Sequence, residues 1–167
     1  MLFSLLDAPR RLLALVAVAC IASLAFGLYL QHVVGLEPCP MCIVQRYALV
    51  MVAIVAGVSA ATSSRRSLLA GSALLVILSG FGAFAAARQS FLQWYPPDVV
   101  SCGRDFYGMI ETFPLKRAIP MIFKGSGDCS KVDWTFLGGS IANWSFVSFV
   151  VIGLIAMTLI ARLARQR

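Results

Sequence analysis

The sequence predicts an all-α membrane protein, a four-transmembrane-helix bundle with two loops on the outer side of the membrane, the second carrying a short membrane-surface helix. Three observations support this fold class. The 167 residues are 60% hydrophobic and 13% charged, with a mean hydropathy of +0.87, whereas soluble domains are roughly 25% charged. Four apolar runs reach the ~20 residues that a helix needs to cross the hydrocarbon core. Positive residues gather on one side of these runs.

The apolar runs define the spans of a single domain that covers residues 1–167. No Ser-, Pro- or Gly-rich linker and no internal repeat divides the chain. The first run follows Arg10 and Arg11, as in a signal peptide, but no small-residue cleavage pattern occurs before His32, so we expect a retained helix. We expect spans near 12–31, 43–62, 67–87 and 144–161, and outer loops over 32–42 and 88–143.

The positive residues predict the orientation of the bundle. With both termini inside, the inner segments hold one acid, Asp7, while the outer segments hold nearly equal numbers of acidic and basic residues. Because positive residues are retained on the cytoplasmic side, both termini are predicted to be cytoplasmic. The net charge of +7 therefore reflects topology, with the lipid bilayer as the expected partner and no nucleic acid. The inner arginines are Arg10, Arg11, Arg65, Arg66, Arg162, Arg165 and Arg167.

This orientation places four of the five cysteines outside and leaves Cys20 in the first span. Thiols on the oxidising side of a membrane are competent to form disulfides, whereas a thiol in an apolar span stays protonated and inert. Four cysteines allow three pairings, and the sequence alone does not choose among them. The two-residue spacing makes Cys39 and Cys42 a ready local pair, which leaves Cys102 with Cys129.

The four outer cysteines have three possible functions: redox chemistry, structural disulfides on an exported loop, or a four-cysteine zinc site. A second C-x-x-C is missing, which disfavours zinc, and we expect no metal. Pro38 and Pro40 suit a chain that enters a helix at this point, since proline is tolerated in the first turn. Cys42 then lies near the positive end of the helix dipole, where a thiolate is favoured. A thiolate is the species that attacks a disulfide.

Arg46 is the unusual residue of the second span. It follows Cys42 by four residues, so the two side chains share a helix face one turn apart. An ionisable residue inside a membrane indicates function, although arginine also extends to lipid headgroups as a simple anchor. In the functional interpretation, the guanidinium stabilises a thiolate at Cys42 and hydrogen-bonds a lipophilic partner. A quinone meets this requirement, because it dissolves in membranes, accepts two electrons and carries carbonyl oxygens.

The outer segment 88–143 must present one cysteine pair to a soluble partner. Trp94 suits an interfacial aromatic belt, and the following prolines favour an extended chain, which is compatible with peptide-like docking or with an ordinary loop. The stretch "LKRAIPMIFKG" at 115–125 mixes apolar and basic residues. It predicts a short helix on the membrane surface that holds Cys129 near the membrane.

Three stretches, "LQHVVGLEPCPMCIVQRYAL", "LQWYPPDVVSCGRDF" and "SGDCSKVDWTFLGGSIANW", together resemble the disulfide bond formation protein B family of bacterial inner-membrane thiol:quinone oxidoreductases. The resemblance covers nearly the whole chain. It implies an enzyme of the inner membrane with periplasmic cysteines, a protein-disulfide:quinone oxidoreductase. Electrons would pass from a soluble periplasmic thioredoxin-fold oxidase of the DsbA type, through two cysteine pairs, to ubiquinone, with menaquinone as an alternative under anaerobic conditions.

The resemblance also implies a role for each site residue. Cys102 matches the cysteine that the partner's thiolate attacks, and Cys129 the thiol that this attack releases. Cys129 then attacks Cys39, and Cys42 matches the thiolate that engages the quinone ring. Arg46 matches the arginine that holds the quinone and supports the thiolate.

One position departs from the family pattern. A histidine near the end of the third span is replaced by Gln89, which can hydrogen-bond but cannot titrate near neutral pH. We count Gln89 as a further candidate quinone ligand. The only histidine, His32, is expected to end the first helix as an interfacial anchor.

Two other functions remain open on the sequence. An outward-directed thiol reductase would need redox cysteines within reach of the cytoplasm, where only Cys20 is near a candidate position. A membrane scaffold would use its disulfides structurally and Arg46 as an anchor.

Overall fold

The computed structural model describes residues 8–96 and 127–165, which contain four membrane-length helices and a small outer subdomain. The segment 97–126, with the predicted surface helix at 115–125 and Cys102, lies outside the described residues. The helices are long and apolar enough to cross a membrane, which confirms the predicted fold class. In chain order the elements are α2 (Pro9–His32), α3 (Pro40–Ala61), α4 (Arg65–Trp94), α7 (Gly127–Ser130), β1 (Thr135–Phe136), β2 (Gly139–Ser140) and α8 (Ile141–Arg165).

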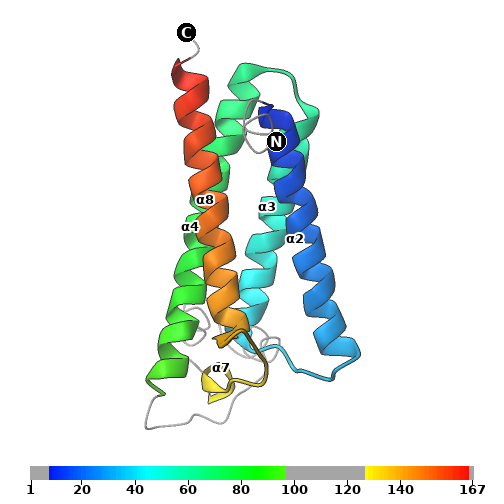
Figure 1. The fold of residues 1–167 in the computed structure, drawn as a ribbon, viewed down its shortest axis with the longest axis vertical. Helices are drawn as coiled ribbons and strands as arrows, with labels where there is room; N and C mark the ends of the chain where they lie inside the picture. Colours follow the sequence, from blue (N-terminus) through cyan, green and yellow to red (C-terminus); the bar gives the residue numbers. More distant parts are fainter. Residues whose placement is uncertain (1–7, 97–126, 166–167) are drawn as a thin grey trace, which may run out of the picture.

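The four long helices run side by side along the longest axis of the molecule (Figure 1). Helix α4 packs against both α3 and α8, and α2 packs against α3. Helix α2 begins and α8 ends at one end of the bundle, while α7 lies at the other (Figure 1). The cysteine-bearing start of α3 is therefore at the same end as α7.

Small residues let α4 and α8 approach closely. The ring of Phe149 on α8 is 2% exposed and lies over Gly82 of α4, where an added Cβ would fall 2.4 Å from the ring. Such small-residue contacts are how helices pack in a membrane, where lipid is as apolar as the helix surface. On the outside of the bundle, large apolar side chains such as Val18 and Ile77 are exposed, as expected for positions that face lipid.

Arginines close the end of the bundle opposite the cysteines. The guanidinium of Arg10 donates from Nε to the carbonyl of Ala60 at 2.9 Å, which joins α2 to the end of α3. Arg65 donates in the same way to the carbonyl of Leu163 at 3.0 Å, which joins α4 to α8. The last carbonyls of a helix have no partner within the helix, so these arginines satisfy groups that would otherwise need water.

Helix α3 starts earlier than predicted, so Pro40 to Cys42 belong to the helix and not to the predicted loop 32–42. Pro40 occupies the first position, and the Cys39 sulfur accepts a hydrogen bond from the backbone N–H of Cys42 at 3.3 Å. This cap begins the helix before the continuous apolar run does. Helix α2 ends at His32, as predicted.

Helix α4 has 30 residues and continues to Trp94, so the predicted loop 88–143 wrongly includes its last turns. A helix needs only about 20 residues to cross the hydrocarbon core, but α4 meets no proline before Pro96. Its final turns bury Gln89 and Leu92. The loop prediction is also wrong at its other end, since a hairpin of β1 and β2 leads directly into α8 at Ile141.

Candidate active site

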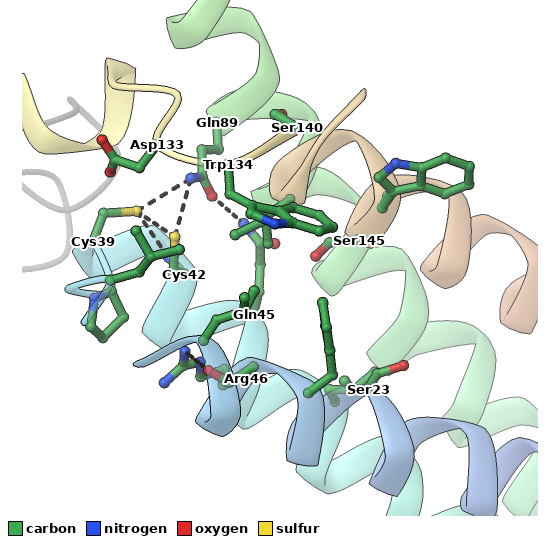
Figure 2. A pocket seen from close by; sticks show the side chains of 18 of the residues that line it. Ser23, Cys39, Cys42, Gln45, Arg46, Gln89, Asp133, Trp134, Ser140 and Ser145 are labelled. Carbon is green, nitrogen blue, oxygen red and sulfur yellow. Dashed lines mark hydrogen bonds between the residues drawn. The ribbon is translucent and has the colours of Figure 1, made fainter. Parts of the chain in front are cut away.

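A cavity of about 760 Å³ opens at the cysteine end of the bundle. Its walls come from α2, α3, α4, α8 and the segment that leads into the hairpin. Most of the lining is apolar, but a few polar side chains converge in it, and Figure 2 shows them with the two sulfur atoms at one side. They include Cys39, Cys42, Gln45, Arg46 and Gln89, and the charged residues Glu37, Lys131 and Asp133 also line the cavity. Concave, largely apolar sites with a few placed polar groups are typical of small-molecule binding.

The cap of α3 positions the first cysteine pair. Cys39 is the residue before the helix and Cys42 lies in its first turn, so both sulfurs face the same side. Their Sγ atoms are 2.7 Å apart and unbonded. The two thiols can therefore close to a disulfide with little movement, as the spacing predicts.

Cys129 of α7 completes a group of three thiols. Its side chain is fully buried and packs with Cys39, Met41 and Leu92 in a small apolar cluster. It is also hydrogen-bonded to Cys39. The structure thus brings Cys129 from the second outer segment to the first cysteine pair.

The hydrogen bonds distinguish Cys39 from its neighbours. The bond with Cys129, then the bond with Cys42, and then burial raise the pKa of the Cys39 thiol well above its ordinary value of 9.0. Cys39 therefore keeps its proton at pH values where an ordinary thiol begins to lose it, 2.7 Å from the Cys42 sulfur. A protonated thiol is a poor nucleophile, so Cys39 is suited to be attacked once oxidised and not to attack.

Two glutamines hold the sulfurs from the other side. Gln89 reaches from α4 and donates from Nε2 to the sulfurs of Cys39 at 3.3 Å and Cys42 at 3.2 Å. Gln45, on α3, donates from its own Nε2 to Oε1 of Gln89 at 2.6 Å, and Figure 2 shows this chain of bonds. Both glutamines are buried. Gln89, which the sequence suggested as a candidate quinone ligand, thus directs its amide at the two thiols.

Arg46 lies one turn below Cys42 and lines the cavity, as its spacing predicts. Its guanidinium donates to Oε1 of Gln31 and, at 3.0 Å, to the carbonyl of Gly27, both on α2. Within the described residues, no hydrogen bond joins it to Cys42. Arg46 therefore connects α3 to α2 beside the cavity.

A row of aromatic rings crosses the cavity from α2 to α8. Phe26 contacts Trp134 edge-on at 5.6 Å, Trp134 stacks on Phe136 at 6.1 Å, and Phe136 lies 6.1 Å from Trp144 between ring centroids. The Trp144 indole N–H donates to the carbonyl of Phe136 at 2.9 Å. The segment that follows Cys129 is thus anchored to both helices beside the cavity.

Comparison with known proteins agrees with this arrangement. The family model for disulfide bond formation protein DsbB matches residues 9–159. A protein named disulfide bond formation protein B from Polaromonas naphthalenivorans (strain CJ2) is 81% identical over 167 residues, which covers all of both chains. One of the same name from Aromatoleum aromaticum is 52% identical over 144 residues, covering 86% of this chain and 87% of the relative.

The chain belongs to the disulfide bond formation protein B family. Its general role is therefore in disulfide bond formation, as a multi-pass membrane protein. The family resemblance expected from the three quoted stretches is confirmed.

For a member of the disulfide bond formation protein B family, the described site joins most of the residues expected from the sequence. Cys39, Cys42 and Gln89 are in direct contact with one another, and Cys129 is beside them. Cys102 lies outside the described residues. Cys20 is 2% exposed in the main core of the bundle, away from these thiols.

Gln45 is the site residue that sequence reasoning missed. Its amide lies in an apolar span, three residues after Cys42, and a polar group inside a membrane helix needs a partner. That observation could have indicated Gln45, because positions three apart share a helix face. Its partner, Gln89, comes from another helix and could not have been inferred from local spacing.

Proposed function

We propose that this protein reoxidises a periplasmic thioredoxin-fold dithiol oxidase of the DsbA type and passes the electrons through two cysteine pairs to a membrane quinone. The observation that carries the proposal is the alignment of three thiols. Cys129 contacts Cys39, Cys39 contacts Cys42, and Cys42 lines the cavity. This order runs from the outer segment to a site large enough for a lipophilic ring.

Thiol–disulfide exchange accounts for the transfer between the pairs. The partner's thiolate attacks Cys102, which breaks the Cys102–Cys129 disulfide and releases Cys129 as a thiolate. Cys129 attacks Cys39, forms a Cys39–Cys129 disulfide and displaces Cys42 as a thiolate. The partner's second thiolate displaces Cys102, leaving the partner oxidised. Cys102 then attacks Cys129, which restores the outer disulfide and returns Cys39 as a thiol.

After these exchanges the two electrons reside on Cys39 and Cys42. Hydrogen bonds from Gln89 and from the protonated Cys39 stabilise negative charge on the Cys42 sulfur. The start of α3 adds the positive end of its dipole. A quinone in the cavity would be the acceptor: formation of the Cys39–Cys42 disulfide would release two electrons and the Cys39 proton to it, and a second proton from water would complete the quinol.

The chemistry of the cavity fits a quinone. Its volume of about 760 Å³ lies in the usual range of small-molecule sites, and its apolar walls suit a ring that partitions from lipid. Quinone oxygens accept hydrogen bonds, and the guanidinium of Arg46 has more N–H donors than its two bonds to α2 use. Ubiquinone and menaquinone share these features.

The charge distribution supports the inner membrane and an orientation with the cysteines in the periplasm. Arg10 and Arg65 lie at the end of the bundle where α2 and α4 begin, opposite α7. Lysine and arginine are retained on the cytoplasmic side of short-looped membrane proteins, so both termini would be cytoplasmic. In that orientation Cys39, Cys42 and Cys129 face the oxidising compartment.

The test is turnover with purified components. The protein in detergent is mixed with ubiquinone and a reduced thioredoxin-fold partner, and quinone absorbance is followed. We expect quinone reduction that matches partner oxidation mole for mole, and no reduction with Cys42→Ser. If the wild-type protein oxidised no partner and reduced no quinone, the proposal would be wrong and a scaffold with structural disulfides would be favoured.

A further inference from the structure

The orientation of the Gln89 side-chain amide determines whether the sulfurs of Cys39 and Cys42 face a hydrogen-bond donor or an acceptor. The side-chain amide of glutamine has a donor end, NH₂, and an acceptor end, C=O, of nearly the same size. Gln89 presents its NH₂ end to Cys39 and Cys42. Turned over, it would present an oxygen, which repels a thiolate and hydrogen-bonds only a protonated thiol.

Gln45 is the group that distinguishes these two orientations. Its Nε2 donates to Oε1 of Gln89 at 2.6 Å, and within the described residues Oε1 accepts no other hydrogen bond. The hydroxyl of Ser90, next along α4, is buried and has no partner, so it does not supply a competing donor. If Gln89 turned over while Gln45 kept its orientation, two NH₂ groups would face each other in a buried site, and unsatisfied buried donors cost free energy.

We propose that Gln45 is a positioning residue that holds the donor end of the Gln89 amide toward the sulfurs of Cys39 and Cys42. It acts through Gln89, and among the described residues no hydrogen bond joins it to either thiol. The inference rests on the proposed function in one respect, namely that Cys42 must react as a thiolate to deliver electrons. Gln45 then keeps the site ready for the ionised form of Cys42 before any ligand or partner binds.

The decisive substitution is Gln45→Glu, which preserves the size and shape of the side chain. A carboxylate accepts hydrogen bonds and cannot donate, so Gln89 must turn its NH₂ end toward position 45 and its oxygen toward the sulfurs. The matched control is Gln93→Glu. Gln93 lies one turn further along α4, and its amide contacts the carbonyl of Lys131 and the hydroxyl of Ser140, not the thiols.

The first readout is the rate at which Cys42 is alkylated by N-ethylmaleimide in the fully reduced protein, without quinone or partner, followed by mass spectrometry of the Cys42 peptide. Because only the thiolate reacts, we expect Gln45→Glu to slow this alkylation about tenfold, the change for one unit of pKa. Gln93→Glu should alter it less than about twofold on the same scale. An unchanged rate in Gln45→Glu would overturn the proposal.

The second readout separates positioning from folding. Restoring a donor toward the sulfurs should restore reactivity, and we expect Gln89→His in the Gln45→Glu background to do so, since a protonated imidazole donates from both nitrogens, one to position 45 and one to the sulfurs. We expect this double variant to recover at least half of the lost rate on a logarithmic scale. A double variant as slow as Gln45→Glu, with the same thermal unfolding temperature as wild type, would contradict the proposal.

The two proposals fail in different ways. If quinone reduction is absent from the wild-type protein but Gln45→Glu still slows alkylation, the proposed function is wrong and the positioning role stands. If wild type turns over and Gln45→Glu has normal alkylation and normal turnover, only the positioning role is wrong. Where both hold, kcat falls in Gln45→Glu while KM for quinone stays within about twofold of wild type, because ground-state binding is unaffected.

Discussion

Cys129 on α7 is hydrogen-bonded to Cys39 at the start of α3 and is fully buried against it. The contact joins two segments that are distant in the sequence. It places Cys129 beside Cys39, the thiol of the first pair whose pKa is raised. Thiol–disulfide exchange requires the attacking sulfur to reach the sulfur that is attacked. In the proposed relay, this contact makes Cys39, and not Cys42, the residue that exchanges with Cys129.

Substitution of Cys129 should stop the relay at its first step. In Cys129→Ser the Cys102–Cys129 disulfide cannot form, so the reduced partner meets no disulfide to attack and no Cys129 thiolate is released to open the first pair. We expect steady-state quinone reduction to fall at least about a hundredfold. With oxidised partner, the free Cys102 thiolate can attack the partner's disulfide and release one partner thiol, and the resulting Cys102-linked complex should be visible on a non-reducing gel.

Cys20→Ala provides the matched control for this experiment. It also removes a buried thiol, but from the core of the bundle, so turnover should stay within about twofold of wild type while stability falls slightly. Full turnover in Cys129→Ser would exclude the relay.

The raised pKa of Cys39 predicts a dependence of stability on pH. The folded protein keeps the Cys39 proton above the ordinary value of 9.0, at pH values where the unfolded chain has lost it. Stability from this group is therefore fully present below that value and decreases as pH rises above it, by up to about 1.4 kcal/mol per pH unit.

The measurement is thermal unfolding of the fully reduced protein in detergent, from about pH 8 to pH 10.5, compared with Cys39→Ser. Groups away from the site titrate in both proteins, so the difference between the two curves reports Cys39 together with Cys42, the thiol hydrogen-bonded to it. We expect wild type to lose stability more steeply than Cys39→Ser across this range. Parallel curves would show that the folded protein does not retain this proton.

The spans could be predicted because their information is local, whereas the ends of the helices could not. Apolar runs of sufficient length specify a crossing helix whatever surrounds them. The first turn of α3 depends on a sulfur cap from Cys39, and the last turns of α4 on the burial of Gln89 and Leu92. Hydropathy records neither effect, because both arise from side chains that meet in the folded protein.

The site shows the same division. Cys39 and Cys42 are neighbours in sequence, so their contact follows from helical spacing. The pairs Gln45–Gln89 and Arg46–Gly27 join different helices. Sequence reasoning placed Arg46 on the correct face but could not show that its guanidinium would be bonded to α2.

Gly82→Ala should destabilise the contact between α4 and α8. The new Cβ would lie 2.4 Å from the ring of Phe149, and overpacking of this kind costs about 1–3 kcal/mol. The control is Gly80→Ala on the same helix, where nothing lies within 4 Å and alanine should instead favour the helix by up to about 1 kcal/mol. Thermal unfolding in detergent measures both.

A smaller side chain at position 149 should relieve the clash with the added Cβ. Phe149→Leu in the Gly82→Ala background should recover part of the lost stability, although Phe149→Leu alone is destabilising, because the two changes are coupled through one contact. Additive effects in the double variant would show that the ring and the glycine do not meet.

Arg46 joins α3 to α2, and in the proposed function it also binds the quinone. Its bonds to Gln31 and Gly27 tie α3 to α2, while its remaining N–H donors are available to a ligand in the cavity. Gln31→Ala removes one bond of the tie and keeps the guanidinium. Arg46→Ala removes both roles, and Arg46→Lys keeps the charge without the planar set of donors.

If Arg46 binds the quinone, KM for quinone should rise about tenfold or more in Arg46→Ala, since a charged hydrogen bond contributes about 1.5–3 kcal/mol. Arg46→Lys should fall between Arg46→Ala and wild type, and Gln31→Ala should remain within about threefold of wild type. Thermal unfolding of the same variants measures how much the bonds between Arg46 and α2 contribute to stability. Equal losses of stability in Gln31→Ala and Arg46→Ala, with KM unchanged in both, would show that Arg46 serves only to join the two helices.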